Sequence, residues 1–121
     1  WTYAFQNNTA SGAVQNSSGQ FAKPSVVSTT AAAAEAVKGM PADFRVSITN
    51  PPGKDAYPIS SFTWLLFYQS PSNKAYGKTM VEFLKWALSD GQKFAPALGY
   101  APLPAEVVKH EMEAIKKVKV Q

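Results

Sequence analysis

Seven consecutive residues near the middle of the chain, Phe62 to Tyr68 with the sequence FTWLLFY, constrain its fold more than any other feature. A strand with one face in water alternates apolar and polar side chains, and this segment does not alternate. Pro58 precedes it and Ser70-Pro71 follows it, so both of its ends are marked by turn signals. The segment therefore predicts a strand that is covered on both faces, as in an α/β sheet flanked by helices.

The rest of the composition fits a folded chain with one core. A length of 121 residues, with 45% hydrophobic and 17% charged residues, is long and apolar enough to bury such a core. The longest apolar run has seven residues, whereas a membrane-spanning helix needs about 20. The absence of cysteine excludes disulfides and thiolate metal sites, and it leaves the compartment open. The chain starts at Trp1 without a basic or apolar leader, so we expect that any signal peptide has been removed or never existed.

The positive charge of the chain is spread along it. The formal net charge of +4 is compatible with nucleic-acid binding, but most lysines stand singly and Arg45 is the only arginine. The one cluster, Lys116, Lys117 and Lys119, follows a predicted helix, where cations interact favourably with the helix dipole. We therefore expect no nucleic-acid partner.

The first half of the chain predicts short elements separated by turns. Residues 1–8 are typical of a helix end or the tail of a strand, and Ala13-Val14 and Phe21-Ala22 predict a small hairpin or a paired turn around residues 16–19. Pro24 can open a helix over residues 25–38, which Gly39 ends. Residues 43–49 alternate apolar and polar side chains and predict a half-exposed strand.

Two amphipathic helices are predicted after the apolar segment. The first covers residues 74–89, with Ser72 or Asn73 as its N-cap. The second begins at Pro104 and carries Val108, Met112 and Ile115 on one face. Residues 93–103 between them predict a short helical turn and a loop.

No catalytic or metal-binding pattern is present in the sequence. The only histidine, His110, lies between Lys109 and Glu111 in the middle of a predicted helix, where exposed surface is its simplest interpretation. None of the eight carboxylates stands at a metal-ligand spacing from it, and the nucleophile elbow and the glycine-rich nucleotide loops are absent. We therefore expect no enzyme activity, no catalytic residue, no metal and no cofactor.

Four features have a weak capacity to bind ligands. The loops at Ser11-Gly12 and Ser18-Gly19 can hold an oxyanion when they open a helix, but no clear helix follows them, so we interpret them as turns. Arg45 is either an anion clamp or a solvent-exposed residue of its strand. The N-terminus of the helix at Lys74 attracts anions by its dipole alone. The aromatic residues of FTWLLFY and Trp86 are either a stacking platform or part of the core, and their spacing favours the core.

Several stretches, taken in order, resemble the C-terminal part of the bacterial phosphate-binding proteins of phosphate ABC transporters, the PstS family. They are WTYAFQN, AVQNSSGQFAKPS, the alanine-rich helix, NPPGKDAYPISSFTWLLFY and LKWALSDGQKFAPALGYAPLP. The resemblance implies an α/β chain that is part of a two-lobed type II periplasmic binding protein fold and lacks its N-terminal half. It places residues 1–56 in the C-terminal portion of lobe two, and residues 57–121 in a crossing strand and the C-terminal portion of lobe one.

The resemblance also implies a function and a compartment. The complete receptor captures inorganic phosphate in the periplasm, or elsewhere outside the cytoplasm, and delivers it to an ABC permease in the inner membrane. The family's phosphate ligands lie upstream of the matching stretches, so we expect no phosphate-binding residue in this chain. Its expected partner is the N-terminal half of the same receptor, in the same or a separate chain. An interaction or scaffold protein built on the same half-fold is the alternative.

Overall fold

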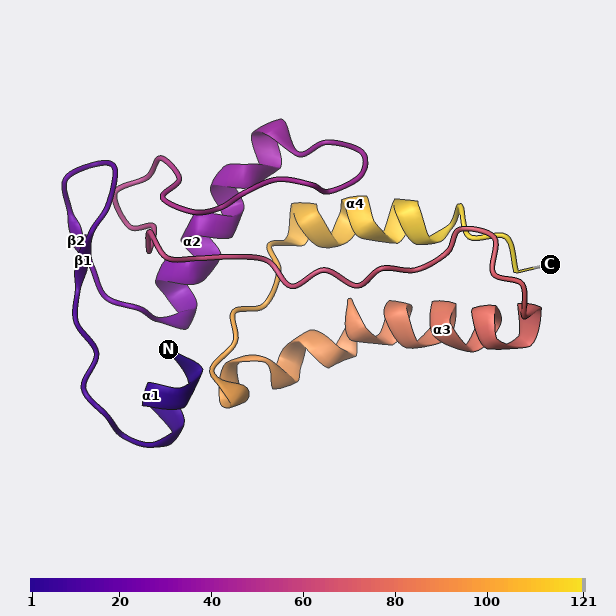
Figure 1. Cartoon of the computed structure of the whole chain (residues 1–121), viewed down its shortest axis with the longest axis horizontal. Coiled ribbons are helices and arrows are strands. Elements are labelled where there is room, and N and C mark those ends of the chain that lie inside the picture. The colour runs from indigo at the N-terminus through magenta and orange to yellow at the C-terminus, as the bar shows by residue number, and fades with distance from the viewer. Residues whose placement is uncertain (121) are drawn as a thin grey trace.

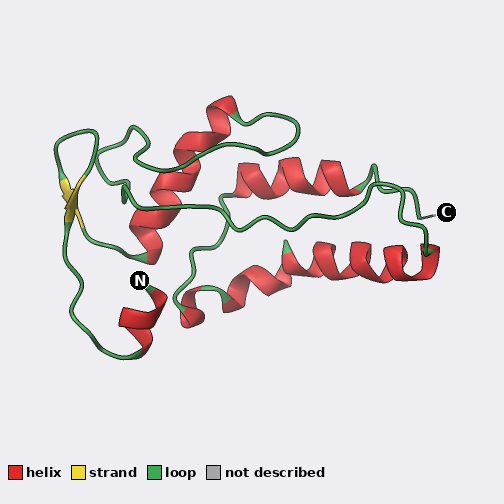
Figure 2. Cartoon of the chain, viewed as in Figure 1, coloured by secondary structure: helices red, strands yellow, loops and turns green. Residues whose placement is uncertain are grey.

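The computed structural model describes residues 1–120, which are mostly helical with few strands (Figures 1 and 2). The order of elements is α1 (Thr2–Gln6), β1 (Val14–Gln15), β2 (Phe21–Ala22), α2 (Val26–Ala36), η1 (Val37–Gly39), α3 (Lys74–Ala87), η2 (Asp90–Phe94), η3 (Pro96–Leu98) and α4 (Ala105–Ile115). The expected α/β class is confirmed only in part, because the sheet of residues 1–120 is limited to the β1–β2 hairpin.

The predicted helices are confirmed, and local capping explains where they begin. The Ser25 side chain accepts a hydrogen bond from the Ser28 N–H at the start of α2, and the Asn73 side chain accepts one from Tyr76 at the start of α3. Gly39 ends η1 directly after α2. Pro104 is the residue before the first turn of α4 rather than its first helical residue, a shift of one position.

The predicted hairpin is also confirmed, and one side chain attaches it to a distant turn. Val14 pairs with Ala22 and Gln15 with Phe21 in an antiparallel register. Asn16, which is only 5% exposed, donates through Nδ2 to the carbonyl oxygens of Gly53, Lys54 and Ala56 at 3.2, 2.9 and 3.1 Å. Its Oδ1 accepts from the N–H groups of Ser18 and Gln20, both at 3.1 Å. A single buried amide therefore closes its own turn and holds the chain of residues 53–56.

The core consists of two separate clusters. The first contains Ala33 and Ala36 of α2 with Ile48 of the loop, and the second contains Val81 and Leu88 of the α3 region with Ile115 of α4. Helices α3 and α4 lie side by side in opposite directions, while α2 and the hairpin occupy the other end of the molecule (Figure 1). The short α1 contacts the α3–α4 connection, where Thr2 Oγ1 donates to the Gly99 carbonyl at 3.2 Å.

The strand predicted over residues 43–49 is wrong, although its pattern of burial is right. Phe44, Val46 and Ile48 are the more buried residues, as the alternation indicated. No strand of residues 1–120 pairs with them, and Phe44 has a φ of +61° with its carbonyl accepting from the Val46 N–H at 2.9 Å. A tight local turn therefore replaces the expected ladder.

The strand predicted over Phe62 to Tyr68 is also wrong for this chain. The segment is an irregular loop that no second strand of the described part accompanies. Its side chains are largely exposed, with Leu65 at 67%, Leu66 at 97% and Tyr68 at 82%. The physical reason is that a strand forms only when its backbone pairs with a neighbouring strand. The apolar run has side chains suited to a strand, but residues 1–120 provide no neighbouring strand to pair with it.

The buried amide of Asn16 gives a direct test of this fold. Asn16→Asp replaces the donor by a carboxylate that faces three carbonyl oxygens, so we expect the free energy of unfolding to fall by about 2 kcal/mol. Urea unfolding followed by circular dichroism measures this loss. Gln15→Glu, the same chemical change on the exposed neighbour, is the control and should alter stability by less than about 0.5 kcal/mol. Equal effects of the two variants would contradict the role given to Asn16.

Candidate functional site

An apolar groove of about 1320 Å³ opens among the described residues. Its walls come from three parts of the chain: the loop of residues 42–48, the extended residues 61–69, and the facing sides of α3 and α4 with Leu103 and Val118. Phe44, Leu65, Phe67, Leu84 and Ile115 are among its apolar lining residues. We call this surface the apolar groove.

The extended residues 61–68 of the apolar groove make no backbone–backbone hydrogen bond, and the Phe62 carbonyl accepts only from the Ser61 hydroxyl, at 3.1 Å. No backbone–backbone hydrogen bond within residues 1–120 involves them, whereas Pro58 and Gln69 on either side accept bonds from Asn50 and Lys119 at 2.7 Å. The contacts that do reach the segment come from side chains, such as the bond of 3.3 Å from Trp64 Nε1 to the Phe44 carbonyl. An extended backbone with free donors and acceptors is a template for an added strand.

One acidic side chain of the apolar groove is partly withdrawn from water. Glu111 lines the groove beside Ala114 and Ile115, and burial raises the pKa of its carboxyl group above the ordinary value. The other charged lining residues are Asp43, Arg45 and Lys117. Arg45 and Asp43 form an exposed ion pair of 2.7 Å, and the hydrogen bond from Arg45 lowers the pKa of Asp43. No local pattern in the sequence marks Glu111, because its burial depends on segments far away in the chain.

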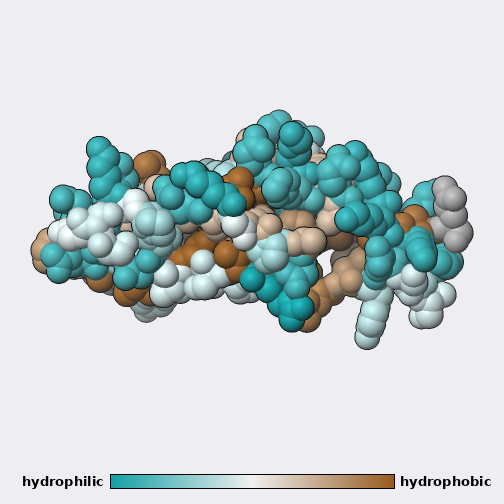
Figure 3. Space-filling view, turned by 90° about the horizontal axis from the view of Figure 1, so that it is seen from above, coloured by the Kyte–Doolittle hydropathy of each residue, from teal (hydrophilic) through white to brown (hydrophobic). Residues whose placement is uncertain are grey.

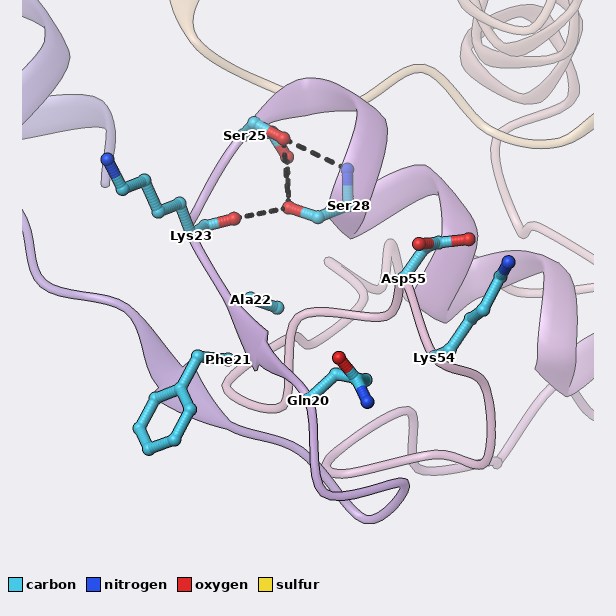
Figure 4. Close-up of a pocket in the computed structure, with 8 residues that line it drawn as sticks. All are labelled: Gln20, Phe21, Ala22, Lys23, Ser25, Ser28, Lys54 and Asp55. Atoms are coloured by element: carbon cyan, nitrogen blue, oxygen red, sulfur yellow. Dashed lines mark hydrogen bonds between the residues drawn. The ribbon is translucent and has the colours of Figure 1, made fainter.

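A second, smaller hollow of about 640 Å³ lies where β2 meets the start of α2. Its polar groups are Lys23, Ser25, Ser28, Lys54 and Asp55, a combination that would suit an anion if they converged. They do not converge: the Ser28 hydroxyl donates to the Lys23 carbonyl at 2.7 Å, and the side chains of Lys23 and Lys54 diverge from each other (Figure 4). The hollow therefore has the composition of an anion site without its geometry.

The other candidate residues from the sequence lie apart from each other. His110 is exposed on α4, and Arg45 is exposed and pairs with Asp43. Ser11 and Gly12 lie in the exposed loop before β1. Ser18 and Gly19 form the hairpin turn, where Gly19 has a φ of +79°. The N-terminus of α3 is capped by Asn73.

The aromatic residues were expected in the core, which holds in part for Phe62, packed against the first core cluster, and is wrong for Trp64, Tyr68 and Trp86. Trp64 is 47% exposed and Trp86 is 48% exposed. Trp86 packs against Phe83 and Phe94, with ring centroids 6.0 and 6.3 Å away, on the outer surface of α3 and η2. The reason is that each core cluster is small, so the larger rings remain at its edge.

Residues 1–120 contain neither a metal-binding cluster nor a membrane-spanning helix. No group of three or more histidine, aspartate or glutamate side chains in this range is arranged to hold a metal ion. No helix in the same range combines the length and the apolarity that crossing a membrane requires.

The raised pKa of Glu111 predicts a pH dependence of stability. A carboxyl group whose pKa is higher in the folded than in the unfolded chain binds protons more tightly when folded, so stability falls as pH rises from its ordinary pKa to the raised one. We expect Glu111→Gln to remove this fall and to be more stable than the parent at pH 7. Urea unfolding of the parent and of the variant at pH 4 and pH 7 measures this difference in the free energy of unfolding. Glu113→Gln is the control with the opposite sign, because the hydrogen bond from Lys116 lowers the pKa of Glu113.

Comparison with known proteins relates the chain to one group. No protein-family model matches it. The phosphate-binding protein PstS of Xylella fastidiosa strain 9a5c is 39% identical over 107 residues, which is 88% of this chain and 29% of that protein. The proteins of the same name from Haemophilus influenzae and Methanocaldococcus jannaschii are 38% and 35% identical, over 89% and 98% of this chain and 32% and 33% of theirs.

These relatives are named as binding proteins rather than enzymes, in line with the expectation from the sequence. The chain spans about a third of the length of the curated relatives it matches. It is therefore a partial PstS-like chain, homologous over most of its length to one segment of the phosphate-binding proteins PstS.

Proposed function

We propose that this chain is a scaffold component of a two-lobed phosphate receptor with the type II periplasmic binding protein fold. Residues 1–56 contribute to lobe two, and residues 57–121 provide a crossing strand and part of lobe one. The proposal is carried by one combined observation. The chain is homologous to a third of PstS, while its central apolar residues 61–68 make no backbone–backbone hydrogen bond within residues 1–120. A polypeptide with these two properties needs further strands from another part of the receptor, which we call the complement.

The complement, in this proposal, is the remaining part of the receptor, which adds strands beside residues 61–68. Each added strand supplies backbone donors and acceptors to the open segment. It also covers side chains such as Leu65 and Leu66, and burying apolar area provides the main driving force of such an association. The strand that the sequence predicts then forms only in the complete protein.

Phosphate itself is held by groups outside this chain. A buried phosphate needs a dense set of aligned donors, because an unpaired buried charge is very costly. The most favourable group of residues within the described part, around Ser28, has its hydroxyl committed to the Lys23 carbonyl and its lysines directed apart. The role of this chain is to position the lobes and allow them to close on the ligand.

The complete receptor works outside the cytoplasm and delivers phosphate to an ABC permease in the membrane. No covalent bond is made or broken in this process. Specificity rests on hydrogen bonding to the anion, and transport rests on opening of the cleft at the permease.

Calorimetric titration with inorganic phosphate tests whether the phosphate-binding groups lie outside this chain. We expect no saturable binding by the 121-residue chain alone, because it lacks a convergent set of donors. We expect one-to-one binding when the chain is co-expressed with the part of the Xylella fastidiosa protein that lies outside the matching segment. Saturable binding by the chain alone would overturn the proposal. Association of the two parts without phosphate binding would favour the alternative, a scaffold protein on the same half-fold.

The open segment gives a second test. Leu66 is 97% exposed, so Leu66→Asp should leave the free energy of unfolding of the isolated chain within about 0.5 kcal/mol of the parent. The same variant should weaken association with the complementary part at least about tenfold, because it places a charge in an apolar contact. Analytical ultracentrifugation measures the association. Val27→Asp, on an exposed residue of α2 outside the apolar groove, is the matched control, and equal weakening by both variants would contradict the assigned docking site.

A further inference from the structure

The net charge of the chain is concentrated at one end of the molecule. Five lysines lie where α3 begins and where the chain leaves α4, and one glutamate accompanies them: Lys74, Lys78, Lys116, Lys117, Lys119 and Glu113. This group has a formal charge of +4, equal to that of the whole chain, because the other seven basic residues are matched by seven acidic residues. We call this group the basic end.

Contacts of the described residues bring the two parts of the basic end together. Lys74 Nζ donates to the Lys119 carbonyl at 2.7 Å, and the Lys119 N–H donates to the Gln69 carbonyl at 2.7 Å. The Val120 side chain lies against Gly77 in α3. A Cβ atom added at Gly77 would be 3.1 Å from Val120 Cγ1. Hydrophilic side chains are visible at this end of the molecule, as they are along much of the same face (Figure 3). The lysines therefore form one surface although they are about 40 residues apart in the sequence.

The lysines of the basic end are available to a partner. All five are exposed, and within residues 1–120 only Lys116 forms an ion pair, with Glu113 at 2.6 Å. Such a pair on the surface contributes little to stability. Apart from the hydrogen bond of Lys74 to the Lys119 carbonyl, the charge of these lysines contributes little to the stability of the described fold, and its local field attracts anionic material.

We propose that the basic end docks on a membrane surface that contains anionic lipid headgroups. Lys117 borders the apolar groove and the other four lysines do not line it, so the exposed lysines do not converge on one cavity and suit a diffuse negative surface better than a single small anion. Tyr76, 59% exposed in the first turn of α3, and the half-buried Val118 and Val120 lie among the lysines, so the same surface offers an amphipathic ring and short apolar side chains at headgroup depth. The proposal does not depend on phosphate binding by the chain or by a complete receptor.

Sedimentation with lipid vesicles tests the proposal on the 121-residue chain. We expect binding to vesicles of phosphatidylglycerol and phosphatidylcholine, weak binding to phosphatidylcholine alone, and loss of binding as NaCl rises from about 0.1 M to about 0.5 M. The triple variant Lys116→Glu, Lys117→Glu and Lys119→Glu should partition at least about a hundredfold less, because each lysine near an anionic surface gives about a fivefold gain.

A matched control separates the position of the charges from their number. The variant Lys23→Glu, Lys38→Glu and Lys54→Glu makes the same change in net charge away from the basic end and should keep most of the binding. If the first triple variant does not fold, Lys→Gln at the same three positions replaces it. Equal loss in both triple variants, equal binding to neutral vesicles, or no binding to anionic vesicles would each overturn the proposal, and the last outcome would direct attention to an acidic protein partner.

Discussion

The side-chain amide of Asn16 is the interaction on which the first half of the structure depends. It is buried, it satisfies two N–H groups of its own turn, and it donates to three carbonyl groups in residues 53–56. The hairpin has only two residue pairs, and a hairpin of this size is marginal in water without further contacts. The turn after Asn50 likewise has no strand to hold it. One amide therefore stabilises two pieces of chain that would otherwise be weakly ordered, and it fixes the approach to the open segment.

The helices and the hairpin could be predicted from the sequence because their signals are local. Ser25 and Asn73 cap helices within three residues of themselves, and the turn from Asn16 to Gly19 joins strands that follow each other directly. The role of Asn16 could not be predicted, since its acceptors lie 37 to 40 residues away. The same limit applies to the candidate site: the apolar side chains of the groove were visible in the sequence, but the burial of Glu111 was not.

The failed prediction of a strand at residues 62–68 is informative in physical terms. The side chains there meet every local requirement of a covered strand, and the structure leaves them exposed. A sequence records the environment for which its side chains are suited, whereas a structure of one chain contains only the neighbours which that chain supplies. Homology to a third of PstS explains the discrepancy without giving up either observation. The two small core clusters fit the same explanation, since a larger assembly shares its core among more elements.

The open edge at residues 61–68 also has a consequence for the isolated polypeptide. Unpaired backbone groups beside apolar side chains are the usual starting point for self-association, and natural sheets protect such edges with charge, proline or bulges. Here Pro58 and Pro71 lie outside the edge, and no charged residue interrupts it. Purified alone and at high concentration, such a polypeptide is prone to form oligomers or fibrils. Its stability in storage therefore depends on a low concentration or on a partner that binds residues 61–68.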